Sequence, residues 1–415
     1  MTFKTLEPSE MVFTTMAASA IQAALNEAAL CQGIAWLSLY SGKGYLCAMP
    51  LRIPRNTILQ GAVRGMRRPL VGTKNSISDT KGSTLLVGHL DHPSVSFITL
   101  ASGAMIDGIE ILYLYQVQTL LEDDKHNMEP IPYGFTIDVP NGSHGCNIRN
   151  VNCANPYQFL GIGIYDHFHG ADGIFVDAVQ GYPLYRGIVL GRVADVPRIS
   201  NIHFNPNTMS HNLDDSVKDW VVQHASAFTF YFVEEFMMTN VFAYGYRRGF
   251  WFRSFDENVT TNSGAANGGS YGSLTNFGLD KVHEGLLIQS TGITNRQGVS
   301  ISNGRIIPFA PGKDKQEGST PRSGIKFDSQ STGSLSVSNV SFFGQHERSL
   351  WMGPSSTARV TIAGGQSTEF TEQMVLNESS EAIVRLMGVR SFHPEGPRVQ
   401  GRGSNQVEDV NGILG

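Results

Sequence analysis

From about residue 33 to residue 392, the chain consists of short apolar segments separated by Gly, Asn, Pro and Asp. Many segments open with Gly and continue with apolar residues at alternating positions, a pattern typical of β-strands with one buried face. Seven of these segments look equivalent, and they begin at Gly108, Gly134, Gly161, Gly173, Gly187, Gly249 and Gly285. The pattern predicts a chain built from many short, equivalent strands.

One segment has a different pattern. Residues 17–30 (AASAIQAALNEAAL) are rich in Ala and carry apolar residues at helical spacing. We predict a short helix here, and we expect it to be the only substantial helix of the chain.

Two observations indicate that the strands repeat as coils. Gly134 and Gly161 are 27 residues apart, and Gly161 and Gly187 are 26 apart, about one turn of a β-solenoid. The motif apolar-x-Asn-Val/Ile also recurs, at Asn150, Asn201, Asn240 and Asn339. Because Asn adopts left-handed backbone geometry readily and can stack on Asn of the next coil, we expect these residues to occupy tight turns. Longer turns, which would form groove walls, are expected at 120–131, 206–223, 258–273 and 308–322.

Composition narrows the possible partners. The chain has 415 residues, 45 of them Gly, only 16% charged residues and a formal net charge of −5. This net charge does not indicate a surface that binds nucleic acid. No apolar stretch is long enough to span a membrane. We therefore expect a soluble protein that binds neither nucleic acid nor a membrane. The N-terminus lacks the pattern of a secretory signal, so secretion would require a signal already removed or another route.

The four cysteines are few for the length, and their spacing fits neither a zinc site nor a redox motif. They are Cys31, Cys47, Cys146 and Cys153. Two interpretations stay open, namely buried thiols and a bridge between Cys146 and Cys153.

Three segments resemble a known family. Residues 21–65 are similar to an N-terminal cap in which a short helix leads into a coil ending in apolar-Pro-x-Asn-x-x-Leu-x-Gly, although Ser41–Lys43 depart from its usual Pro-x-Gly turn. This arrangement resembles right-handed parallel β-helix proteins of the pectate-lyase-like superfamily. Residues 181–207 and 228–252 are similar to its bacterial and phage branch described as glycosyl-hydrolase-28-related.

The resemblance implies an all-β chain, a single-domain right-handed parallel β-helix with a short N-terminal capping helix. The expected divisions are a cap at 1–32, a β-helix at 33–395 and a C-terminal tail at 396–415. The resemblance is informative about the fold, but it leaves the reaction open because β-helices host many activities.

Hydrolysis of a glycosidic bond requires two carboxyl groups about 5 to 9.5 Å apart, and adjacent coils of a solenoid lie about 4.8 Å apart. Glu234 is the preferred acid or nucleophile, because the glycosyl-hydrolase-28-related branch has an acidic residue at the equivalent position. Glu235 departs from the pattern of that branch. Alternation predicts that one of Glu234 and Glu235 points inward. Asp195 and Asp166 are the candidate partners of Glu234, and Glu235 is a further catalytic candidate.

Other residues are candidates for substrate binding, each with a structural alternative. Arg198 would bind the carboxylate or sulfate of an acidic sugar, with His203 beside it. Alternatively, both residues would have a structural role in a salt bridge and a turn. Arg247 and Arg248 would neutralise a uronate in a lyase or would be solvated surface residues. His167 would contact substrate or pack within its loop. The aromatic candidates for sugar stacking, if exposed, are Tyr185, Tyr246 and Trp251.

These features predict a carbohydrate-active protein that hydrolyses an extracellular polysaccharide, with the site in residues 160–260. The alternatives are a lyase acting on a uronate-containing glycan and a non-catalytic tailspike-like or surface module that binds glycans. No cofactor or metal is expected, a homotrimer is left open, and the expected location is extracellular or virion-associated.

Overall fold

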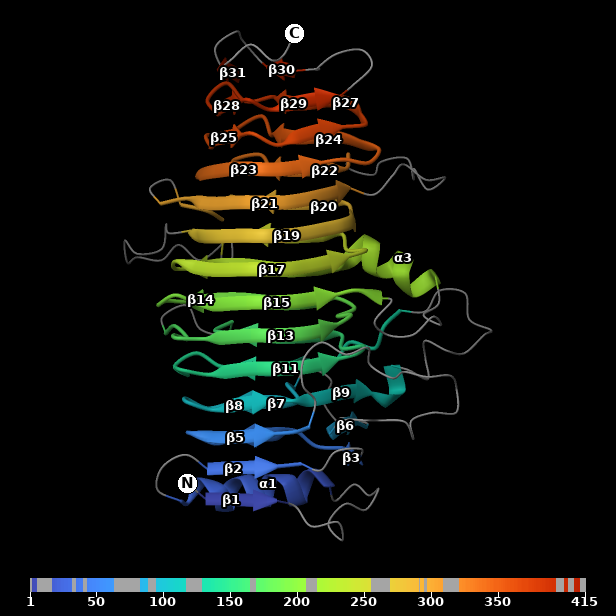
Figure 1. The fold of residues 1–415 in the computed structure, drawn as a ribbon, viewed down its shortest axis with the longest axis vertical. Helices are drawn as coiled ribbons and strands as arrows, with labels where there is room; N and C mark the ends of the chain where they lie inside the picture. Colours follow the sequence, from blue (N-terminus) through green and yellow to red (C-terminus); the bar gives the residue numbers. More distant parts are fainter. Residues whose placement is uncertain are drawn as a thin grey trace. The chain divides into compact units, whose positions relative to one another are not determined.

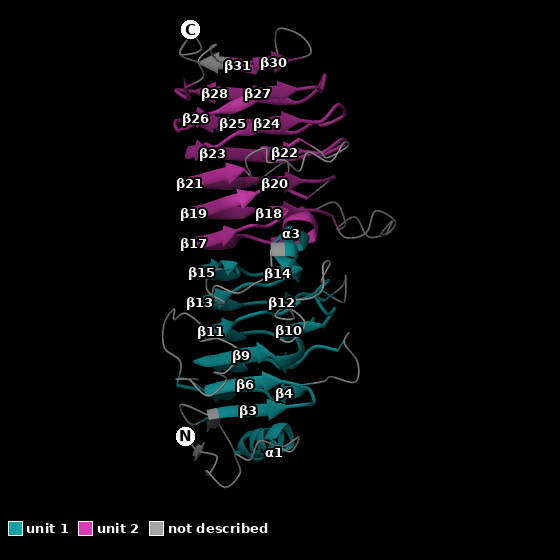
Figure 2. Cartoon of the chain, turned by 90° about the vertical axis from the view of Figure 1, so that its right-hand side faces the viewer, with its two compact units in different colours: residues 1–221 teal, residues 222–415 magenta. Residues whose placement is uncertain are grey.

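The computed structural model describes residues 2–5, 17–31, 35–39, 43–62, 83–88, 95–116, 129–164, 169–206, 215–254, 269–290, 292–294, 297–308, 321–392, 399–401 and 407–410. The chain forms two compact units, Met1–Val221 and Val222–Gly415, which Figure 2 distinguishes by colour. Within each unit, short strands of successive coils stack into two parallel sheets, as Figure 1 shows. The prediction of an all-β parallel β-helix is confirmed. The predicted division at 32 and 395 stays a prediction.

In unit 1, the first sheet contains β4 (Leu51–Ile53), β7 (Ile98–Leu100), β10 (Phe135–Val139), β12 (Gln158–Ile162) and β14 (Arg186–Val193). The second sheet contains β1 (Thr2–Thr5), β2 (Ala35–Ser38), β3 (Lys43–Cys47), β5 (Thr57–Gln60), β6 (Ser83–Val87), β8 (Met105–Asp107), β9 (Ile109–Tyr113), β11 (Asn147–Cys153), β13 (Phe175–Gly181) and β15 (Arg198–Phe204).

In unit 2, the first sheet contains β16 (Ser226–Val233), β18 (Arg248–Phe252), β20 (Glu284–Ile288), β22 (Ser323–Phe327), β24 (His346–Met352), β27 (Phe370–Asn377) and β30 (Val399–Gly401). The second sheet contains β17 (Phe236–Tyr244), β19 (Gly272–Val282), β21 (Val299–Pro308), β23 (Ser334–Phe342), β25 (Arg359–Ala363), β26 (Gln366–Thr368), β28 (Ile383–Met387), β29 (Arg390–Phe392) and β31 (Val407–Val410).

Helix α1 (Ala17–Ala29) confirms the predicted N-terminal helix. It buries its apolar face, including Ile21 and Leu25. Its Gln22 side chain donates to the carbonyl of Arg52 at 3.0 Å and accepts from the Arg52 N–H at 2.7 Å. These bonds satisfy backbone groups of the terminal strand β4, which would otherwise offer an open sheet edge.

The expectation of a single helix was wrong. Helix α3 (Asp215–His224) lies in the segment 206–223, which the sequence predicted as a long turn. The described parts of the other three expected turns contain no helix, and residues 120–128, 258–268 and 309–320 lie outside the described residues.

The core is built from side chains that repeat from coil to coil. In unit 2, Phe228 pairs with Phe250 and Phe230 pairs with Phe252 between β16 and β18. The stacked rings have centroid separations of 4.9 and 4.7 Å, which match the spacing of about 4.8 Å between neighbouring strands. The backbone spacing therefore sets the aromatic stacking.

Most of the Gly-initiated segments are strands, but they are not all equivalent. Those beginning at Gly108 and Gly173 lead into the second sheet, and those beginning at Gly134, Gly187, Gly249 and Gly285 lie in the first. Gly161 is instead the next-to-last residue of β12, in the first sheet. Register also shows that Gly161 pairs with Asp138 and Val189, so Gly134 and Gly187 are not its counterparts. The spacings of 26 and 27 residues thus predicted the approximate length of a coil, but they did not predict which residues pair between coils.

All four cysteines are free thiols, so the interpretation with a Cys146–Cys153 bridge was wrong. Cys47, Cys146 and Cys153 are buried. Burial raises the pKa of the Cys47 thiol to about 12 and that of Cys146 to about 11, which keeps both protonated and unreactive at neutral pH.

The predicted Asn turns are confirmed by backbone geometry. The φ angles of the four residues are 50° at Asn150, 55° at Asn201, 54° at Asn240 and 52° at Asn339. One direct Asn stack is present, since Asn339 Nδ2 donates to Asn303 Oδ1 at 2.9 Å. The second sheets bend at these positions, where a left-handed residue costs Asn little.

Ala178 occupies the same turn position in unit 1 as Asn150, because its neighbours Asp177 and Val179 pair with Arg149 and Val151. Its φ is 55°, a conformation that costs a residue such as Ala about 1–2 kcal/mol.

We therefore expect Ala178→Asn to raise the stability of the protein by about 1 kcal/mol, because Asn tolerates this backbone geometry. Ala178→Val is the matched control, and it should destabilise the protein because a β-branched residue resists positive φ. The midpoint of denaturant unfolding measures both effects. Equal midpoints for the two variants would contradict the assignment of strain to this turn.

Candidate functional site

The outer face of the first sheet of unit 2 carries polar and aromatic side chains in columns. Phe250, Leu286 and Ile325 occupy paired positions that point into the core. The next residue of each strand points outward, since side chains alternate along a strand. This outward column contains Trp251, Leu287, Lys326 and Trp351, which pair in register on β18, β20, β22 and β24.

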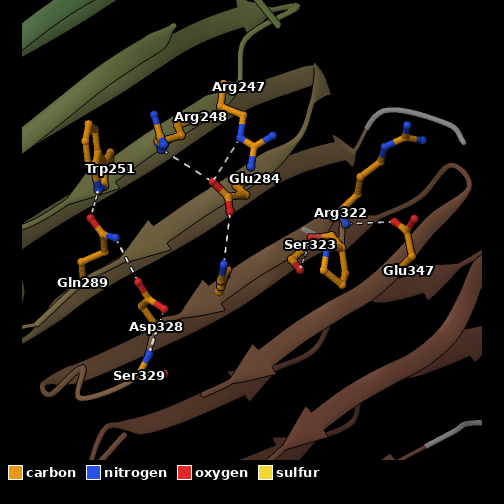
Figure 3. A network of polar contacts seen from close by, with 12 residues as sticks. Arg247, Arg248, Trp251, Glu284, Gln289, Arg322, Ser323, Asp328, Ser329 and Glu347 are labelled. Atoms are coloured by element: carbon orange, nitrogen blue, oxygen red, sulfur yellow. Dashed lines mark hydrogen bonds and ion pairs between the residues drawn. The ribbon is translucent and has the colours of Figure 1, made fainter. Parts of the chain in front are cut away.

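A second column precedes it at the start of the strands, where Arg248 pairs with Glu284. We define the Glu284 cluster as Glu284 with Arg247, Arg248 and Lys326, and Figure 3 labels Glu284 and the two arginines. Glu284 Oε2 lies 3.9 Å from Arg247 Nε and 3.6 Å from Arg248 Nε, and Glu284 Oε1 lies 3.4 Å from Lys326 Nζ. The Glu284 side chain is only 3% exposed.

The Glu284 cluster is an unbalanced arrangement of charge. Three cations surround one carboxylate, and within the described residues Glu284 Oε2 accepts no hydrogen bond. Taking charges out of water costs free energy unless they are paired and hydrogen-bonded. The cluster therefore has unused hydrogen-bonding capacity and an excess of positive charge.

His283 adjoins the same cluster. Burial lowers its pKa to about 3, with further lowering by the charges of Arg247, Arg322, Lys326 and Arg248. The imidazole is therefore neutral at pH 7. Its Nδ1 is buried and has no hydrogen-bond partner among the described residues.

A chain of hydrogen bonds follows the opposite ends of the same strands (Figure 3). Trp251 Nε1 donates to Gln289 Oε1 at 2.7 Å, and Gln289 Nε2 donates to Asp328 Oδ2 at 3.0 Å. Asp328 is in turn fixed by the backbone N–H of Ser329 at 2.9 Å. These bonds hold the indole of Trp251 in one orientation.

Arginine and lysine side chains lie over both tryptophans of the face. Arg248 and Arg253 are 4.3 and 4.4 Å from the Trp251 ring centroid. Lys326 and Arg348 are 4.6 and 4.7 Å from the ring of Trp351. Such cation–π contacts give each ring a positive neighbour while part of the ring remains accessible.

Two further carboxylates complete this face. Glu347 is buried and its Oε2 accepts the backbone N–H of Arg322 at 2.9 Å (Figure 3). Glu372 pairs with Arg348 at 3.0 Å. Together with Glu284 and Asp328, they place four carboxylates on consecutive coils of one unit.

Of the residues predicted from sequence, Arg247, Arg248 and Trp251 lie together on this face. Glu234 and Glu235 form the turn between β16 and β17 in the same unit. The expectation that one of them points into the core was wrong, because Glu234 is half-buried and Glu235 is exposed with a φ of 51°. Both carboxylates contribute to a raised pKa of Tyr271, chiefly caused by burial. Tyr246 is fully buried, which removes it as a sugar-stacking residue.

The other predicted residues belong to unit 1. Asp195 is exposed in the turn before β15, with a φ of 57°. Arg198 is exposed at the start of β15, and burial lowers the pKa of His203 on the same strand. Asp166 and His167 lie outside the described residues.

Tyr185 lies in an aromatic group of unit 1. Its ring stacks on Tyr157 at a centroid distance of 5.0 Å, and Trp220 of α3 lies 5.9 Å away. The ring of Tyr185 is thus partly occupied by protein neighbours.

Sequence reasoning missed Glu284, Lys326 and Asp328. A usable signal existed, because Arg248 and Glu284 each directly precede the Gly of a Gly-initiated strand, and that position recurs once per coil. It also missed Asp138 of β10, a residue of unit 1 whose burial raises its pKa to about 7.

No group of three or more potential metal ligands occurs among the described residues. Nor is any helix in the described part of the chain long and apolar enough to cross a membrane.

His283 predicts a specific pH dependence of stability. Its pKa falls from 6.5 to about 3 on folding, so between these values the unfolded chain binds a proton that the folded chain does not. Stability contributed by the neutral imidazole is present above pH 6.5 and is lost as the pH falls toward 3. The slope from this group is at most about 1.4 kcal/mol per pH unit.

We expect His283→Gln to flatten the decline of unfolding free energy between pH 6.5 and pH 4. Denaturant unfolding across this range measures the slope. The difference in free energy between parent and variant should be constant above pH 7, which serves as the internal control. A difference that stays constant below pH 6.5 as well would show that His283 does not titrate as inferred.

Comparison with known proteins gives matches in structure only. No protein-family model matches the sequence, and no curated protein matches it. A mutant tailspike protein of Escherichia coli bacteriophage HK620, in complex with a pentasaccharide, is similar with a TM-score of 0.59 at 9% identity. The match covers 94% of this chain and 66% of the tailspike chain, slightly under two thirds of its length.

An exopolygalacturonase from Thermotoga maritima is similar with a TM-score of 0.50 at 8% identity, over 90% of this chain and 87% of that chain. Both neighbours are right-handed parallel β-helix proteins of the pectate-lyase-like superfamily. At these identities the likeness establishes the fold alone. The chain therefore has the right-handed parallel β-helix fold that the sequence resemblance implied.

Proposed function

We propose that this protein is carbohydrate-active and that unit 2 binds an acidic polysaccharide along the outer face of β18, β20, β22 and β24. The observation that carries the proposal is the Glu284 cluster, in which three cations surround one buried carboxylate. An acidic group of a ligand beside these cations would add a second negative charge and would accept charge-assisted hydrogen bonds.

Trp251 and Trp351 support a sugar as the ligand. Both rings are partly exposed on the outward column, one on β18 and the other on β24. Aromatic rings stack on the apolar faces of sugars, and the hydrogen bond to Gln289 fixes the Trp251 indole in advance. A chain of sugars crossing the strands would meet a ring, cations and a second ring in turn.

We propose hydrolysis of glycosidic bonds as the reaction. Glu234 remains the preferred acid or nucleophile, since it is half-buried just after β16 and forms no ion pair among the described residues. Glu284, Asp328 and Glu347 supply further carboxyl groups on the same sheet. The partner in the reaction would be a carboxylate at the separation that hydrolysis requires, about 5 to 9.5 Å.

A lyase reaction is the second candidate, and a specific observation favours it. The neutral, buried His283 lies among Arg247, Arg248, Arg322 and Lys326. A lyase requires a base to remove a proton beside a carboxylate whose charge is neutralised by cations. Arg247, Arg248 and Lys326 would neutralise the carboxylate. His283 is buried and its pKa is about 3, which makes it a weak base, so the group of cations is the feature that favours this reaction.

The structural neighbours support a saccharide ligand, because the tailspike protein is in complex with a pentasaccharide and the other neighbour is an exopolygalacturonase. An extracellular or virion-associated location and a homotrimeric assembly fit this proposal. Glycan binding without cleavage is the third outcome that experiment has to distinguish.

We expect Arg248→Gln to weaken binding of polygalacturonate or alginate about tenfold, because it removes a charge-assisted contact. Trp251→Ala should weaken it by a similar factor through loss of stacking. Affinity electrophoresis with these polymers, and with neutral dextran for comparison, measures the effect. Arg390→Gln, which alters an exposed arginine of β29, is the control and should bind as the parent does. Unchanged affinity in Arg248→Gln would refute the proposed binding face.

We expect Glu234→Gln to lower turnover more than threefold on a polysaccharide that the parent cleaves. Mass spectrometry of the products identifies the reaction, since added water indicates a hydrolase and unsaturated fragments indicate a lyase. Glu235→Gln, at the exposed neighbouring position, is the matched control and should retain turnover. Turnover of Glu234→Gln within threefold of the parent would remove Glu234 from the mechanism. Binding without cleavage would leave a glycan-binding module.

A further inference from the structure

Unit 2 carries a second polar feature, on a sheet that the proposed function does not use. The outer face of β23, β25 and β28, which are adjacent strands of the second sheet, contains a groove of about 190 Å³. Figure 1 shows these strands on successive coils, coloured orange to red. The groove is lined by Ser334, Leu335, Ser336, Arg359, Val360, Thr361, Ile383 and Arg385.

Register explains why hydrogen-bond donors converge there. Ser336, Thr361 and Arg385 pair in sequence across the three strands and form one outward column. Ser334 pairs with Arg359 two residues earlier, which forms the neighbouring column. Because adjacent strands lie about 4.8 Å apart, the two guanidinium groups and three hydroxyl groups share one small area.

The electrostatics of the groove favour an anion. No acidic residue lines it. Arg359 forms no ion pair with a described carboxylate. Arg385 is held by a 2.7 Å contact between its Nε and Glu408 Oε2. This contact uses Nε alone, so the two terminal nitrogens of Arg385 retain their N–H donors. One carboxylate beside two guanidinium groups leaves a net positive charge.

The size of the groove limits the ligand. Its volume is below the roughly 300–1,000 Å³ typical of sites for drug-sized molecules, so it fits a single small group. Two guanidinium groups and three hydroxyl groups provide donors from several directions. A sulfate or phosphate group, which presents several acceptor oxygens in a tetrahedral arrangement, matches these donors better than the planar pair of oxygens in a carboxylate.

We propose that this groove binds a sulfate or phosphate group, either as the free ion or as an ester on a sugar. The site is distinct from the proposed polysaccharide face, because it lies on the other sheet and shares no residue with the Glu284 cluster. Its occupant would be recognised by charge and hydrogen bonding, without an aromatic platform among the lining residues.

Isothermal titration calorimetry on the full chain tests the proposal at constant ionic strength. The probes are inorganic sulfate, inorganic phosphate, glucose 6-sulfate and glucose 6-phosphate. We expect at least one probe to bind the parent at one site, and we expect Arg359→Gln to weaken that binding about tenfold. Esters binding more tightly than the inorganic ions would assign the site to a modified sugar, and the reverse would assign it to the free ion.

Two further variants complete the test. Ser336→Asp should abolish binding, because it places a negative charge in the groove at an exposed position that the fold tolerates. Arg390→Gln should bind as the parent does, which separates local recognition from a general effect of charge. The proposal is overturned if no probe binds the parent, or if Arg359→Gln and Ser336→Asp bind as tightly as the parent. Loss of binding in Arg390→Gln equal to that in Arg359→Gln would also overturn it.

Discussion

Parallel hydrogen bonding between successive coils is the constraint on which the other features of this protein depend. Each strand pairs with the strand one coil away at a spacing of about 4.8 Å, and side chains at paired positions share one face. Stacked phenylalanines therefore form the core, as Phe228 and Phe250 do at 4.9 Å. A slip of one residue would exchange the core and outer faces, which is why the register is firmly specified.

The same pairing places charged residues next to one another. Arg248 and Glu284 are 36 positions apart in the sequence, yet they occupy paired positions on β18 and β20. Burial of Glu284 among three cations gains little for folding, because desolvation offsets the attraction between the charges. Such an arrangement is more readily understood as preparation for an anionic ligand than as a source of stability. The proposed polysaccharide face rests on that reasoning.

The turns follow a second rule, which concerns backbone conformation. Where the second sheet bends, one residue per coil takes positive φ, and Asn fills this position in most coils of unit 2. Gly364 and Gly388, with φ of 67° and 62°, bring the same geometry to later coils of that unit. The residue types differ, but all of them tolerate left-handed geometry, so the turn conformation is preserved along the unit.

The sequence by itself determined the fold class, the N-terminal helix and the positions of the bends. Alternating apolar residues indicated the strands, the Ala-rich segment indicated the helix, and Asn residues such as Asn201 indicated the bends, whereas the parallel β-helix itself was implied by the family resemblance. It also identified Arg247, Arg248 and Trp251 as candidates, because their residue types suit a sugar site.

Only the tertiary structure decided which residues meet. Glu284 and Lys326 lie beside Arg248 because coils of unequal length still align in register. The loops between the strands differ in length, and their composition does not reveal which residues of neighbouring coils will pair. Burial likewise distinguishes Tyr246, which lies in the core just before β18, from Trp251, which lies within β18 and is partly exposed. Local sequence fixes the conformation of each strand and turn, whereas contacts between coils depend on the path of the whole chain.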